Sequence, residues 1–378
     1  MKRNPKSLIV LCGAFLFTSA SAQEKVEPKE GQSKVQIAIL LDTSGSMSGL
    51  IEQTKTQLWK VVNTFIGAKQ NGQIPFVEVA LYEYGAGSKN PNFIRSIQPL
   101  TRDLDQISED LFALNTSGSQ EYCGAVIAEA TNTLKWDHSP DVYKAIFIAG
   151  NEPFTQGSVD SSKACKDAIA KGIIVNTIHC GNEQEGINGG WKSGALLADG
   201  SFLVINHNAA VVHIETPQDS KIVALNEKLN KTYIAYGKQG ARKLASQSAQ
   251  DGNALKKKES GAAVGRAVTK ASKNYWNASW DLVDASKEKT FDWSKVKDED
   301  LPAEMRKLDL EGRKKFVARK ETERGAVQKK IQALNEARKE FVAEKRRESA
   351  VSGEETLDVA VTKTVRDQAS KKGYQFKK

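Results

Sequence analysis

The sequence lacks the motifs of the familiar enzyme classes. It has no GxSxG, HExxH or glycine-rich phosphate-binding motif, and its four histidines are dispersed. None of its four cysteines lies in a CxxC pair, which argues against a zinc site. It also has no internal repeat of fixed period. Hydrolase, zinc-protease and nucleotide-binding chemistry therefore have little support in this chain.

Apolar runs long enough to cross a bilayer are also missing. The only long apolar stretch, residues 7–19, follows a basic start and precedes a small-x-small pattern at residues 20–22. This arrangement predicts a signal peptide over residues 1–22, too short for a membrane span. With 39% hydrophobic and 27% charged residues, the remainder is typical of a soluble globular protein. We expect an exported protein, periplasmic or extracellular, with no transmembrane segment.

Three cysteines remain after the predicted signal peptide, and export permits disulfides. Cys165 lies near the start of a predicted helix, and Cys180 ends the strand that follows. A helix start and the end of the next parallel strand lie at the same edge of a sheet, within the reach of a disulfide. We predict a Cys165–Cys180 disulfide, with Cys123–Cys165 as the alternative.

Strand and helix patterns alternate over residues 35–238. Parallel strands need crossover connections, and helices supply them on both faces of the sheet. The pattern predicts a doubly wound, mostly parallel six-stranded α/β fold with one antiparallel edge strand. Ligands bind such sheets at the carboxyl ends of the strands. The predicted strands are residues 35–42, 76–85, 93–100, 143–150, 172–181 and 201–207.

The flanking regions differ in composition from this α/β domain. Residues 23–34 are polar and indicate a short linker. Residues 239–269 have few bulky apolar side chains and predict a second linker. Residues 270–378 form a predicted helical, charged appendage with some coiled-coil character, and Trp276 and Trp280 have helical spacing. Its acidic and basic residues are interleaved, so no nucleic-acid binding is expected. The apolar positions of its long helix or helices are Phe316, Val327, Ile331, Leu334 and Phe341.

The segment DTSGSM places three oxygen-bearing side chains at alternate positions where the first buried strand ends. These are Asp42, Ser44 and Ser46. One carboxylate and two hydroxyls are hard ligands that suit Mg²⁺, Mn²⁺ or Ca²⁺. The same residues could instead cap the helix that follows. The α/β context favours the metal site.

The motif and the order of strands and helices resemble a von Willebrand factor type A (VWA) domain over residues 35–238. DTSGSM matches the Asp-x-Ser-x-Ser signature of that family's metal-ion-dependent adhesion site. The resemblance implies that Ser44 and Ser46 bind the metal directly and that Asp42 often acts through water. It also implies a threonine from a later loop and an aspartate after the fourth strand.

The sequence departs from the family at both of these later positions. Where the family has Gly-Gly-Thr, this chain reads NTSGSQEYCG, residues 115–124. Ser119 is the nearest equivalent of the threonine, and the alternatives are Thr116, Gln120 and Glu121.

After the fourth strand the family reads Thr-Asp-Gly, but this chain has Ala149-Gly150-Asn151-Glu152-Pro153. The usual aspartate falls on Gly150, so Asn151 or Glu152 is left to supply an oxygen. The predicted metal site is therefore Asp42, Ser44, Ser46 and Ser119, with Thr116, Asn151 and Glu152 as alternatives.

The resemblance implies a binding protein rather than an enzyme. Family members commonly bind a protein partner whose carboxylate completes the coordination of the metal. Two alternatives remain open from the sequence. One is a metal-dependent envelope enzyme, and the other is a structural envelope-associated protein with an inactive metal site.

Overall fold

The computed structural model describes residues 33–48, 60–61, 63–65, 67–86, 93–205, 214–256, 261–349 and 357–376. The predicted signal peptide and residues 23–32 of the first predicted linker lie outside this range. The described residues belong to one compact unit, Ser33–Lys378. Among them, no helix has the length and apolar character that a membrane span requires.

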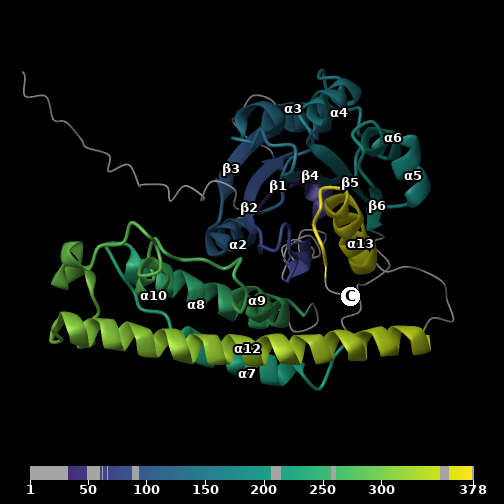
Figure 1. Cartoon of the computed structure of the whole chain (residues 1–378). Helices are drawn as coiled ribbons and strands as arrows, with labels where there is room; N and C mark the ends of the chain where they lie inside the picture. The colour runs from purple at the N-terminus through teal and green to yellow at the C-terminus, as the bar shows by residue number, and fades with distance from the viewer. Residues whose placement is uncertain are drawn as a thin grey trace, which may run out of the picture. The chain divides into compact units, whose positions relative to one another are not determined.

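The described part of the chain contains a six-stranded sheet in the order β3-β2-β1-β4-β5-β6 (Figure 1). All neighbouring strands are parallel except β2 and β3, which pair antiparallel at one edge. The predicted doubly wound fold and its antiparallel edge strand are confirmed. The strands are β1 (Lys34–Asp42), β2 (Phe76–Tyr84), β3 (Ile94–Thr101), β4 (Tyr143–Gly150), β5 (Ile174–Cys180) and β6 (Phe202–Ile205).

β1 is apolar from Ile37 to Leu41 because it lies inside the sheet and both of its faces are covered. Ile37 and Ile39 belong to one buried cluster, whereas Ala38 and Leu40 belong to another. Successive side chains of a strand point to opposite faces, so an unbroken apolar run is what a doubly covered strand requires.

Helices cover the two faces unequally. The face of Leu40 packs against α3, α4 and α6, and the face of Ile39 packs against α2, α7, α9, α12 and α13. The helical elements are η1 (Gly45–Met47), α2 (Leu104–Ala113), α3 (Cys123–Thr133), α4 (Ser161–Ala170), α5 (Glu183–Asn188), α6 (Trp191–Leu196), α7 (Asp219–Asn230), α8 (Gly240–Lys256), α9 (Ala262–Lys270), α10 (Leu282–Ala285), η4 (Trp293–Lys295), η5 (Asp298–Asp300), α11 (Ala303–Arg306), α12 (Leu310–Ser349) and α13 (Leu357–Ser370).

The predicted linker 239–269 is wrong, because this segment forms α8 and most of α9. Val264 and Val268 of α9 join the core beneath the sheet. The segment contains few bulky apolar residues, but its many alanines and glycines permit close packing of helices. Its order also depends on buried polar groups, which composition alone does not reveal.

An ion network buried between α2, α8 and α9 supplies much of this order. Arg266 binds Asp105 of α2 and, at 2.5 Å, Asp251 of α8. Lys270 binds the second oxygen of Asp251 at 2.7 Å. The hydroxyl of Tyr275 also donates to Asp105. The charges are at most 8% exposed, so each relies on its partners rather than on water.

A second buried network holds α12 in place. Arg324 binds Asp281 at 2.7 Å and Asp284 at 3.0 Å, and its guanidinium lies 4.1 Å from the ring centroid of Tyr233. Trp280 stacks on the ring of Tyr233, and the centroids of the two rings lie 5.7 Å apart. The helix expected around Trp276 and Trp280 is absent, since both lie outside helices and α10 begins at Leu282.

The C-terminal helices are part of the compact unit and not a separate appendage. Ile331 of α12 and Val365 of α13 belong to the core below the sheet. The hydroxyl of Tyr143 on β4 donates to Gln368 at 2.8 Å, and that of Tyr374 donates to the carbonyl of Lys34. Of the one or two long helices predicted around residues 316–341, the structure has one, α12, which is 40 residues long.

We predict that Arg266→Met lowers the free energy of unfolding by about 3–5 kcal/mol, because Asp105 and Asp251 would lose the arginine that they share. Lys163→Met is the control, since Lys163 pairs with Asp167 on the surface and such a pair contributes about 0–1 kcal/mol. Urea unfolding of both variants measures the difference. Equal effects would show that the buried network does not hold α8 and α9 to α2.

Candidate functional site

The end of β1 brings the DTSGSM side chains together. Asp42 is fully buried, and its Oδ1 accepts a hydrogen bond of 2.7 Å from the backbone N–H of Ser44. This bond turns the chain so that the hydroxyls of Ser44 and Ser46 lie 3.0 Å apart. Ser44 is buried and Ser46 is exposed, so the group opens to solvent on the Ser46 side.

Asn151 joins this group from the loop after β4. Leu41 pairs with Ala149 in the sheet, so the ends of β1 and β4 lie side by side. The hydroxyl of Ser46 donates to Oδ1 of Asn151 at 3.1 Å. Asn151, one of the two alternatives predicted after the fourth strand, therefore contacts the motif. The other alternative is Glu152, whose backbone carbonyl accepts a hydrogen bond of 2.8 Å from Nε1 of Trp191.

The loop that precedes α3 lies against the motif. The N–H of Ser117 donates to the carbonyl of Thr43 at 2.8 Å, and that of Gly45 donates to the carbonyl of Gly118 at 3.3 Å. Ser119, the predicted fourth ligand, is exposed in this loop, and Thr116 is half-buried. Their part in metal binding stays a prediction.

Glu121, which the sequence offered only as an alternative, lies beside the motif. It is 3% exposed and comes two residues before the start of α3. A Cβ atom placed on Gly85 would lie 2.7 Å from Asp42 Oδ1, 3.2 Å from Glu121 Cγ and 3.4 Å from Ser44 Cβ. The three side chains thus surround one point. Gly85 also has a φ of 81°, so glycine is required there for both conformation and space.

Gly150 has no room for the side chain that the family carries at this place. A Cβ there would meet Tyr84 Oη at 2.5 Å, Trp191 Cη2 at 3.0 Å and Asp42 Oδ2 at 3.2 Å. The hydroxyl of Tyr84 is fixed by a 2.8 Å bond to the carbonyl of Ala149. Tyr84 and Trp191 therefore fill the space, which accounts for the departure from Thr-Asp-Gly.

The two carboxylates of the site are poorly stabilised as charges. Burial raises the pKa of Asp42 to about 7, against the lowering effect of hydrogen bonds from Ser44, and the charge of Glu121 raises it further. Burial also raises the pKa of Glu121, against the lowering effect of a hydrogen bond from the Ser44 side chain, and nearby Glu152 raises it further. Among the described residues, Asp42 Oδ2 and Glu121 Oε2 are buried without a hydrogen-bond partner.

These residues fit a hard divalent cation. The site combines two buried carboxylates with the hydroxyls of Ser44 and Ser46, and oxygen ligands of this kind suit Mg²⁺, Mn²⁺ and Ca²⁺. Within the described ranges, no group of three or more His, Cys, Asp or Glu side chains could hold a metal ion by itself. Any metal at this place therefore depends on the serine hydroxyls as well as on the carboxylates.

The predicted disulfide is wrong, because Cys123, Cys165 and Cys180 are all free and buried. Cys165 packs on the Leu40 face of the sheet and Cys180 on the Ile39 face, so the sheet separates them. Cys123 shares the cluster of Cys165 but is not bonded to it. Burial raises the pKa of the Cys165 thiol to about 12, and it also raises those of Cys123 and Cys180.

We therefore expect the folded chain without residues 1–22 to react slowly with a thiol reagent, because its thiols are buried and protonated. After unfolding in denaturant without reductant, all three of these cysteines should react. Spectrophotometric thiol counting in the two conditions makes the comparison. A single reactive thiol in the unfolded chain would instead restore one of the disulfide predictions.

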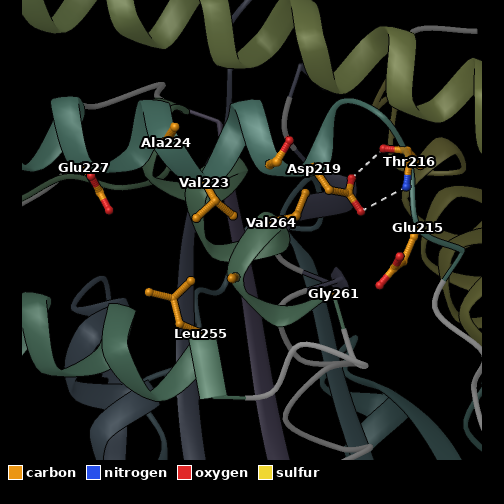
Figure 2. A pocket seen from close by; sticks show the side chains of 11 residues that line it. Glu215, Thr216, Asp219, Val223, Ala224, Glu227, Leu255, Gly261 and Val264 are labelled. Carbon is orange, nitrogen blue, oxygen red and sulfur yellow. Dashed lines mark hydrogen bonds between the residues drawn. The ribbon is translucent and has the colours of Figure 1, made fainter.

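A separate hollow of about 480 Å³ lies between α7, α8 and α9 (Figure 2). Val223, Leu255 and Val264 give it an apolar lining. Of its three acidic lining residues, Asp219 is already engaged, since it accepts from the hydroxyl of Thr216 at 2.6 Å and from Arg338 at 2.8 Å. The hollow contains none of the DTSGSM residues.

No family model and no curated protein matches this chain. The chain is similar to several solved structures, each of which aligns with about half of it. BatB from Bacteroides thetaiotaomicron is 18% identical over 46% of this chain and 90% of its own, with a TM-score of 0.34. The SpRpn10 VWA domain is 16% identical over 47% of this chain and 91% of its own, with a TM-score of 0.37. Mussel byssus PTMP1, solved with a zinc-occupied MIDAS motif, is 12% identical over 47% of this chain and 43% of its own, with a TM-score of 0.36.

The domain has the VWA-like α/β fold that the resemblance led us to expect. The strand order with antiparallel β3 and the Asp-x-Ser-x-Ser turn at the end of β1 are the observations on which this description rests.

Proposed function

We propose that this chain is an exported binding protein whose VWA-type domain holds a divalent cation at Asp42, Ser44 and Ser46. The observation that carries the proposal is the buried carboxylate of Asp42. Its Oδ2 has no hydrogen-bond partner among the described residues, and the hydroxyls of Ser44 and Ser46 belong to the same turn. A buried carboxylate oxygen is strongly destabilised unless a hydrogen bond or a cation satisfies it. The amide oxygen of Asn151 lies within reach of the same ion, and Ser119 remains a candidate ligand.

The cation is Mg²⁺, or Mn²⁺ or Ca²⁺ in its place, because all the ligands are hard oxygens. When bound, it supplies a positive charge at the carboxyl edge of the sheet. The chain itself positions the ligands: Gly85 leaves space for Asp42 and Glu121, and the Ser44 N–H orients the carboxylate of Asp42.

The exposed position of Ser46 leaves the site open on one side, where a protein partner can approach. We expect the partner to offer a carboxylate to the cation, because a divalent cation attracts a carboxylate strongly where water is excluded. The signal peptide predicted over residues 1–22 supports a periplasmic or extracellular location for this binding.

Calorimetric titration with Mg²⁺, Mn²⁺ and Ca²⁺ tests the metal site. The parent should bind one cation, whereas Asp42→Asn should lose binding, because the amide keeps the oxygen that Ser44 bonds but not the charge. The fold should survive, since the substitution removes a buried unpaired charge rather than creating one. Asp167→Asn is the control, because Asp167 is 54% exposed on α4 and pairs only with Lys163. Unchanged binding by Asp42→Asn contradicts the site.

Water-proton relaxation of the Mn²⁺-loaded protein tests the open coordination position. Bound water enhances the relaxation, and a ligand that displaces it reduces the enhancement. We expect a short peptide containing glutamate to reduce it and the matching peptide with glutamine to leave it unchanged. If both peptides have the same effect, the partner does not bind through a carboxylate, even where the metal site itself is confirmed.

A further inference from the structure

Glu121 is an acidic residue that the DTSGSM motif does not include, and the fold holds it firmly at the site. Its backbone N–H donates to Gln156 Oε1 at 2.7 Å, and its carbonyl accepts from the N–H of Cys123 at 3.2 Å. Its side chain then lies with Asp42 and Ser44 around the space above Gly85. The backbone of Glu121 is therefore fixed, and its side chain lies beside Asp42 and Ser44.

Two buried carboxylates in one place require compensation. Asp42 is fully buried and Glu121 is 3% exposed. Among the described residues, each has one buried oxygen without a hydrogen-bond partner, and neither takes part in an ion pair. Like charges at close range in a low dielectric repel strongly, so a cation between them removes two unfavourable effects at once.

Given the proposed function, we propose that Glu121 is a ligand of the same cation and an internal competitor for the carboxylate of the partner. No side chain can enter from Gly150, because Tyr84 and Trp191 fill that space. The second carboxylate of the site therefore comes from the loop before α3 instead of the loop after β4.

The charge balance of the site explains the competition. Asp42 and Glu121 together neutralise the charge of a divalent cation. A third carboxylate would give a buried site a net negative charge, which is unfavourable where water is excluded. The partner's carboxylate can therefore bind fully only by displacing Glu121 from the cation. Glu121 thus strengthens metal binding and weakens partner binding.

The two effects have opposite signs in one variant, Glu121→Gln. Its affinity for Mg²⁺ should fall by about tenfold or more, because the affinity of an oxygen site follows the number of its charged ligands. Its affinity for acetate, measured on the Mn²⁺-loaded protein by water-proton relaxation, should rise by about fivefold or more, a coupling within the usual range between two sites. Calorimetry supplies the metal affinity, and saturating Mn²⁺ keeps the second measurement independent of the first.

Glu129→Gln is the matched control, because Glu129 lies on the same segment about two helical turns further along α3. It loses the same charge and should change neither affinity. Glu121→Thr is a second variant, to be used if Glu121→Gln does not fold, and it should shift both affinities in the same directions. Circular dichroism checks the folding of each variant.

Unchanged metal affinity in both Glu121 variants would show that Glu121 is not a ligand. Weaker metal binding with unchanged or weaker acetate binding would overturn the competition. Failure of the proposed function is distinguishable, since the parent protein would then bind no cation or Asp42→Asn would bind as well as the parent.

Discussion

The site is organised around two buried carboxylates that have no counter-charge among the described residues. Asp42 is brought to the edge by the central strand, and Glu121 by the loop that precedes α3. Gly85 and Gly150 leave the space that these side chains need. Such an arrangement is costly in an empty protein and favourable around a cation, so the same atoms that destabilise the apo site prepare it for metal.

The remainder of the unit keeps this edge in place through buried polar contacts as well as apolar ones. Arg266 ties α9 to α2 and α8, and Arg324 ties α12 to the residues around α10. The C-terminal residues then bond to β1 and β4 at Lys34 and Tyr143. These last contacts lie near the amino ends of the strands, whereas Asp42 lies at a carboxyl end. The C-terminal residues therefore make these two contacts at the amino edge of the sheet, away from Asp42.

Local patterns allowed much of this to be predicted from the sequence. The apolar run of β1, the antiparallel strand β3 and the long helix α12 each follow from a short-range period or a turn. Asp42, Ser44 and Ser46 were also identifiable because they are two residues apart in one turn. By contrast, α8 and α9 were missed because their order comes from ion pairs with residues far away in the chain, such as Asp105.

The parts of the site that the sequence left open depend on sheet register. Only the pairing of β1 with β4 places Asn151 beside Ser46, and only the filling of the space at Gly150 by Tyr84 and Trp191 shows why an aspartate is absent there. In the sequence, Glu121 is indicated by its position just before the apolar first residues of helix α3. The cysteines illustrate the same limit, because their chain positions do not tell which face of the sheet each one occupies.

Anomalous diffraction from crystals grown with Mn²⁺ would locate the cation relative to each oxygen of the site. We expect one strong peak, with oxygens of Ser44, Ser46 and Glu121 at bonding distances of about 2.0–2.6 Å and Asp42 bound directly or through one water. Two results would contradict the proposed site. One is a peak elsewhere in the protein. The other is a cation at the DTSGSM turn, in crystals without any carboxylate ligand, from which the carboxylate of Glu121 is turned away.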